Sequence, residues 1–64
     1  MSANLGIGVG IKVTDKAILV ELQELGETKW IPKSVIDTES EVNNVGDHGD
    51  VVVATWWARK EGLE

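Results

Sequence analysis

The stretch 27–37, ETKWIPKSVID, has the composition of a β-strand that a proline interrupts. Proline donates no backbone hydrogen bond and holds the residue before it in an extended conformation. We therefore expect Ile31 to remain in the strand and pairing to stop at Pro32, with residues 32–34 forming a single 3₁₀ or type I turn. Residues 35–36 would then extend in a new direction, as in a sheet that curls into a small barrel.

Residues on both sides of this stretch have strand patterns. Residues 17–22, AILVEL, predict a central strand that pairs with residues 28–36 through the connection 23–27. Residues 50–55, DVVVAT, predict the last strand, after a polar loop at 37–50. Residues 5–14 alternate strictly, with Leu5, Ile7, Val9, Ile11 and Val13 on one side and Gly6, Gly8, Gly10, Lys12 and Thr14 on the other.

Three glycines on one face weaken a strand, because each costs backbone entropy and offers no side chain for packing. We expect another backbone or a bulky ring to cover this face, or the strand to become ordered only when it is paired. Gly6, Gly8 and Gly10 are therefore candidate contacts with a second copy of the chain.

The end of the chain has the signals of a short helix. Thr55 is placed to cap its N-terminus, Gly62 can adopt the left-handed conformation that follows a helix, and Leu63 can fold back as the apolar contact of a Schellman ending. Two turns are not stable alone, so Trp56, Trp57 and Leu63 are expected to hold the helix to the sheet.

The expected fold is mainly β: a small SH3-like barrel of four to five strands with a short C-terminal helix. WIPKSVI at residues 30–36 resembles the W-F-P-x-S-Y-V segment of the Src-homology barrels, in which a strand ends in a 3₁₀ turn before the closing strand. That family binds peptides with tyrosines and phenylalanines, which this chain lacks, so the resemblance does not imply peptide recognition.

A broader resemblance covers roughly residues 16 to 63. AILVEL, WIPKS and the ending WWARKEGL are similar to short phage and bacterial proteins with A-x-L, W-I-P-K-S and a terminal W-x-A-x-K-x-G-L. The chain departs from that pattern at Trp57 and in the leader before Asp15. The resemblance implies a phage or bacterial origin and no particular activity. A cytoplasmic location (the host cytoplasm if phage-encoded) is expected because the sequence shows neither a bilayer-spanning run nor a signal-peptide pattern.

Length and composition predict one domain spanning residues 1–64, with residues 1–4 disordered. A chain of 64 residues without cysteine has a small core and no disulfide to support it, so self-association is expected. Hydrophobic residues make up 42% of the chain, which is typical of a folded domain. No apolar run is long enough to span a bilayer, and the N-terminus lacks the pattern of a signal peptide.

The net charge of −5 is concentrated in one segment. Five acids and no Lys or Arg lie within residues 37–50, while the other six acids balance the six basic residues. Binding of duplex nucleic acid depends on concentrated Lys and Arg, so this role is not expected. The carboxylates alternate as in a calcium loop, but Val42 and His48 occupy positions that such a loop gives to Gly and Glu. A solvated acidic loop is the favoured interpretation, although weak cation binding stays open.

No catalytic, metal or cofactor site is predicted. GIGVG at residues 6–10 matches neither phosphate-loop motif, and His48 has no second His, Cys or serine motif with which to form a zinc set or a triad. Without Phe or Tyr, the core is expected to need Trp30 and one of the pair Trp56 and Trp57. The remaining indole would be exposed as a contact, and Trp57 is the candidate.

Three functions remain open. The first is a non-enzymatic interaction module that forms a homo-oligomer and contacts itself or another protein through the glycine face or Trp57. The second is a single-stranded nucleic acid binder with Trp30 or Trp57 stacking on a base and cations on phosphate. Its cations would be Lys29, Lys33, Arg59 and Lys60. The third is an enzyme whose site is completed across a symmetry axis.

Overall fold

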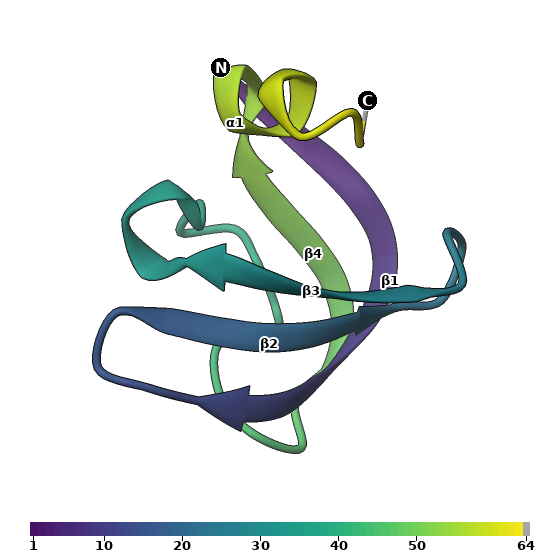
Figure 1. Ribbon diagram of the computed structural model, residues 1–64, viewed down its shortest axis with the longest axis vertical. Helices are drawn as coiled ribbons and strands as arrows, with labels where there is room; N and C mark the ends of the chain where they lie inside the picture. The colour runs from purple at the N-terminus through teal and green to yellow at the C-terminus, as the bar shows by residue number, and fades with distance from the viewer. Residues whose placement is uncertain (64) are drawn as a thin grey trace.

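The computed structural model describes residues 1–63, which form an antiparallel sheet and one short helix (Figure 1). The four strands lie in the order β3-β2-β1-β4. The elements are β1 (Ser2–Val13), β2 (Ala17–Leu22), β3 (Glu27–Pro32), the 3₁₀ helix η1 (Lys33–Val35), β4 (His48–Ala54) and α1 (Thr55–Lys60). The mainly β class and the terminal helix are thus confirmed, and the sheet does not close into a barrel.

The chain turns after Pro32, as expected from the sequence, and we call this turn the proline corner. β3 ends at Pro32, and the next three residues form η1. Ile36 then makes an isolated antiparallel bridge to Val53, and the N–H of Asp37 donates to the carbonyl of Val52 at 2.9 Å. The corner therefore carries the chain from one edge of the sheet, β3, to the other edge, β4.

β1 differs most from its predicted pattern. It begins at Ser2 and pairs from there with β4, so residues 2–4 belong to the sheet. The register of β1 shifts between Asn4 and Ile7 against β4, and again between Gly10 and Lys12 against β2. Each bulge adds a residue and reverses the side to which the following side chains point. The expectation of one continuous apolar face is therefore wrong: Leu5, Gly8 and Gly10 are buried, and Ile7 is only half-buried.

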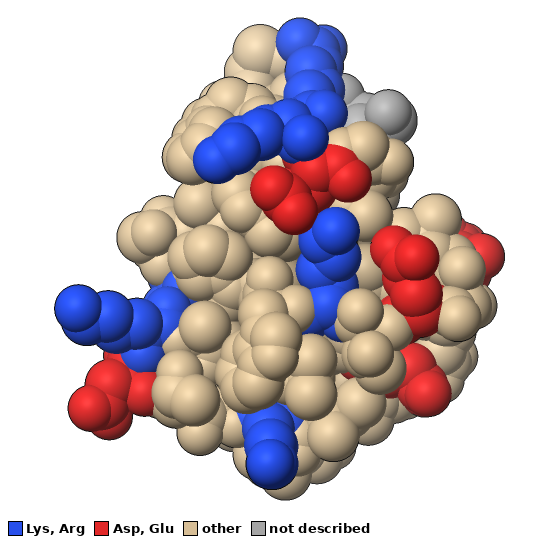
Figure 2. Space-filling model, viewed as in Figure 1, with Lys and Arg blue, Asp and Glu red and all other residues tan. Residues whose placement is uncertain are grey.

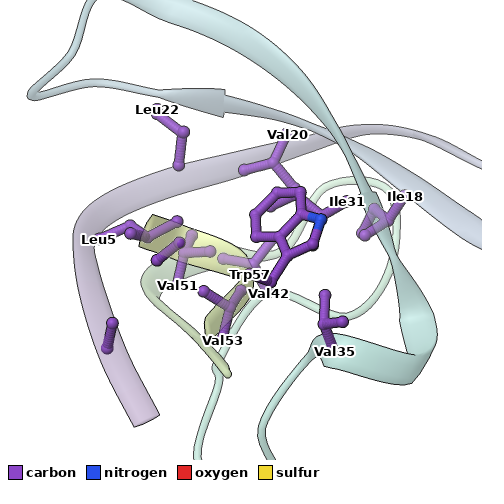
Figure 3. Packing of buried hydrophobic residues seen from close by; sticks show 12 residues of the cluster. Leu5, Ile18, Val20, Leu22, Ile31, Val35, Val42, Val51, Val53 and Trp57 are labelled. Atoms are coloured by element: carbon purple, nitrogen blue, oxygen red, sulfur yellow. The ribbon is translucent and has the colours of Figure 1, made fainter. Parts of the chain in front are cut away.

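The core lies inside the curve of the sheet and contains a single indole, that of Trp57 (Figure 3). Its ring lies among aliphatic side chains from all four strands, from η1 and from the loop after it. Ile18, Val20, Leu22, Ile31, Val35, Val42, Val51 and Val53 are among the buried residues around it. Val42 belongs to the polar loop 37–47 and is 1% exposed, so this loop supplies part of the core.

α1 ends as predicted and starts differently. Gly62 has φ +73°, its N–H donates to Arg59 at 3.2 Å, and the N–H of Leu63 donates to Ala58 at 2.8 Å, which together form a Schellman ending. Leu63 packs against the core. The N-cap position belongs to Ala54, however, with no side-chain cap bond. Thr55 is already helical, so its predicted capping role is wrong.

The hydroxyl of Thr55 is buried and makes no hydrogen bond. We expect Thr55→Val to raise the free energy of unfolding by about 1 kcal/mol, because it removes an unsatisfied polar group and keeps the shape of the side chain. Thr55→Ser keeps the hydroxyl and loses the methyl group, and should lower the same quantity by about 1 kcal/mol. Urea unfolding followed by tryptophan fluorescence measures both. A Val variant less stable than the parent would contradict the prediction.

Candidate interaction surfaces

Two of the three glycines on the glycine face of β1, Gly8 and Gly10, are buried by the chain itself. A Cβ atom on Gly8 would lie 2.6 Å from Val51 Cγ2, and one on Gly10 would lie within contact distance of the carbonyl oxygen of Asn44. The loop 37–47 is bonded to β1 at this point, because Gly10 donates to Asp47 and accepts from Gly46, both at 2.9 Å. The expectation that another backbone covers this face is confirmed at Gly10. The assignment of Gly8 and Gly10 to a contact with a second copy is corrected.

Gly6 has a different role from the other two glycines. It has φ +87° at the first bulge of β1, and its N–H donates to Asn4 Oδ1 at 2.8 Å. Side chains other than glycine are strained in this conformation. Gly6 therefore permits the bulge, after which the side chains of β1 point to the opposite faces of the sheet.

The exposed indoles are those of Trp30 and Trp56. Trp57 is 5% exposed, so its assignment as the contact residue was wrong, and Trp56 is the exposed member of the pair at 62%. Trp30 was expected in the core and is 47% exposed. Trp57 and Ala58 take the core-facing side of α1, and this leaves Trp56 on the opposite side. Of the three indoles, only that of Trp57 belongs to the core.

Trp30 lies in an apolar area on the outer face of the sheet. It is paired with Leu19 on β2, and its neighbour two residues on, Pro32, is paired with Ala17. These three neighbours are half-buried. We call Ala17, Leu19, Trp30 and Pro32 the Trp30 surface.

The Trp30 surface borders the free edge of β3. β3 is the last strand of the sheet and pairs only with β2 among the described strands (Figure 1). The N–H of Lys33 bonds to Lys16 on the β2 side at 2.8 Å, and backbone groups of alternate residues point to opposite sides of a strand. Thr28 and Trp30 therefore direct their N–H and C=O groups away from β2, toward the free edge.

The structure separates the residues proposed for nucleic acid binding. Lys29 and Trp30 are adjacent in β3 and so face opposite sides of the sheet. Lys29 Nζ forms an ion pair with Glu61 Oε1 at 3.3 Å, next to the end of α1. Lys33 lies in η1. Lys29 therefore points away from the Trp30 indole, and Arg59 and Lys60 belong to α1.

A different indole lies beside basic side chains. Trp56, Arg59 and Lys60 are exposed on α1 and are spaced i, i+3 and i+4, so they share one face of the helix. Figure 2 shows Lys and Arg side chains extending over this end of the molecule. We call these three residues the α1 patch. The helical spacing of Trp56, Arg59 and Lys60 in TWWARK predicts this patch once Trp57 is known to lie in the core.

The acidic loop 37–47 uses its carboxylates to bond its own backbone. Asp47 Oδ2 accepts from the N–H groups of Asn43 at 3.0 Å and Asn44 at 2.9 Å, and Asp37 Oδ1 accepts from Glu39 at 2.9 Å. Within residues 1–63, no three His, Cys, Asp or Glu side chains are grouped as metal ligands. His48 is exposed and begins β4, opposite Val9. The loop is therefore an ordered segment, held by its own hydrogen bonds, that places Val42 in the core.

The surface formed by residues 1–63 has no detectable pocket. Among the same residues, no helix has both the length and the apolar content that crossing a membrane requires. No family model, curated protein or solved structure matches the chain.

The packing of the glycine face can be tested by substitution. Gly10→Ala should lower the free energy of unfolding by about 2 to 3 kcal/mol, because its Cβ would collide with the backbone of the loop. Gly26→Ala is the matched control: it has φ +67° and open space around it, so only backbone strain of about 1 kcal/mol is expected. Urea unfolding compares the two. Equal losses would show that the loop does not pack on β1 as described.

Proposed function

We propose that this chain is a small, non-catalytic protein-interaction module that acts as a homo-oligomer, with the Trp30 surface as its self-contact. The observation that carries the proposal is a half-exposed indole on an open strand edge, next to three half-buried apolar residues. Tryptophan is enriched in the central, energetically dominant part of protein interfaces. In the loop, the carboxylates of Asp37, Glu41 and Asp47 accept hydrogen bonds from backbone N–H groups, and within residues 1–63 no three His, Cys, Asp or Glu side chains are grouped as metal ligands.

The small core formed by residues 1–63 supports the same proposal. Small single-core domains gain stability by association when they have neither disulfides nor metals. The core of this chain holds one indole, while the other two are 47% and 62% exposed. Burying Trp30 against a second copy would remove apolar surface from water, at roughly 25 cal/mol per Å².

The proposal predicts that removing Trp30 abolishes association. Light scattering across micromolar to millimolar concentrations should give a mass above the 6.9 kDa of one chain, and Trp30→Thr should shift it to the monomer. Threonine favours strand structure, so the fold should persist, which a far-ultraviolet circular dichroism spectrum checks. Trp56→Thr is the control and should keep the parent's mass. A parent chain that is monomeric at millimolar concentration contradicts the proposal.

We also propose, as a second candidate, that the α1 patch binds single-stranded nucleic acid. The observation that favours this function is the spacing of Trp56, Arg59 and Lys60 on one helix face. Proteins that bind single strands combine an aromatic ring, on which a base stacks, with cations that contact the phosphates. Five of the eleven acidic residues lie in the loop 37–47 and at the start of β4, and Glu61, which follows the patch in sequence, forms an ion pair with Lys29.

Titration with oligothymidine tests this second candidate. It should quench tryptophan fluorescence in dilute buffer, and added salt should reverse the quenching, because phosphate contacts release counterions. Trp56→Ala should abolish the quenching, and Arg59→Ala with Lys60→Ala should weaken it several-fold. Trp30→Thr is the control and should retain it. Quenching that persists in Trp56→Ala would exclude the patch.

A further inference from the structure

We infer that two copies of the chain join through their β3 edges, antiparallel about a two-fold axis at Trp30, so that their sheets form one continuous sheet. This inference rests on the proposed homo-oligomer and specifies how its two copies meet. The other edge of the sheet, β4, already carries the bridge from Ile36 and the bond from Asp37. β3 is therefore the edge that a second copy can extend (Figure 1).

The backbone of β3 is complementary to itself. Thr28 and Trp30 direct donors and acceptors to the free edge, and Pro32 directs a carbonyl there but has no N–H. In an antiparallel pair of identical strands, these donors meet the same acceptors of the second copy. Several registers satisfy the donors of Thr28 and Trp30 equally, so the side chains must decide among them.

The register with Trp30 opposite Trp30 of the second copy has three advantages. The two indoles lie as a direct cross-strand pair, and aromatic pairs of this kind stabilise antiparallel sheets. Glu27, the first residue of β3, falls beside the end of β3 in the other copy, where η1 begins with Lys33, so opposite charges approach each other at both ends of the contact. Lys29 falls opposite Ile31, so the two Lys29 ammonium groups do not oppose each other.

The neighbouring registers lack these advantages. Moving the axis to Lys29 places the two Lys29 side chains opposite each other, and like charges in this position destabilise a sheet. Moving it to Thr28 places Trp30 opposite Gly26, in the turn that precedes β3. That register also opposes Glu27 to Lys29, which already pairs with Glu61 within its own chain. Charge and aromatic pairing thus both select the axis at Trp30.

Disulfide trapping tests the register. Because the chain has no cysteine of its own, only the introduced cysteines can form a disulfide. The axis at Trp30 places Thr28 opposite Pro32 of the second copy, with Cα atoms about 5.5 Å apart, which is within disulfide range. Within one chain the two positions lie about 13 Å apart along the strand, which is too far for a bond. Under mild oxidation, Thr28→Cys/Pro32→Cys should therefore double the intact mass from that of the 6.9 kDa chain.

The single variants distinguish the alternatives. Thr28→Cys alone, Pro32→Cys alone and Lys29→Cys alone should stay monomeric by intact mass on denaturing analysis. A covalent dimer of Thr28→Cys or of Lys29→Cys would place the axis at that residue and overturn the register. A parent chain that is dimeric by light scattering but gives no covalent dimer in any variant would overturn edge pairing and leave the proposed homo-oligomer standing. A monomeric parent would overturn both.

Discussion

The contact on which the rest of the structure depends is the insertion of the Trp57 indole among the aliphatic side chains of the curved sheet. α1 has six residues, too few to be stable without tertiary contacts. Trp57 and Ala58 fix one side of the helix to the core, and the Schellman ending brings Leu63 back against it. Because α1 follows β4 directly, this one ring also decides that Trp56 faces away from the core.

The second constraint is space inside the curve. The sheet and the loop pack so closely on β1 that a Cβ atom at Gly8 would collide with the side chains of Val51 and Val20. A Cβ atom at Gly10 would collide with a backbone carbonyl group of the loop 37–47. The loop keeps its shape because its acids accept hydrogen bonds from its own N–H groups. The negative charge that dominates the composition is therefore partly a structural feature of this loop.

The parts that sequence reasoning predicted correctly depend on local chemistry. Pro32 ends a strand and Gly62 ends a helix through their own backbone geometry, whatever surrounds them. The errors concern properties that only the assembled fold decides. Strict alternation in β1 gave the wrong face because the Gly6 bulge shifts the register against β4, a strand that lies far along the chain. Likewise, composition alone does not reveal which of the three indoles lies in the core.

Within residues 1–63, one edge strand of the sheet, β4, is covered by another segment of the chain, and the other, β3, is not. This difference gives the strongest structural reason to expect association at β3. Natural proteins protect open edges with prolines, charges, bulges or covering segments, because exposed edges pair with other chains. This chain covers β4 with the segment that leaves the proline corner. On β3 the proline lies at the far end of the strand, where it limits the edge to a short segment without covering it, and the indole of Trp30, two residues before that proline, is 47% exposed. An edge of limited length that carries an aromatic residue suits one defined partner strand better than open-ended aggregation.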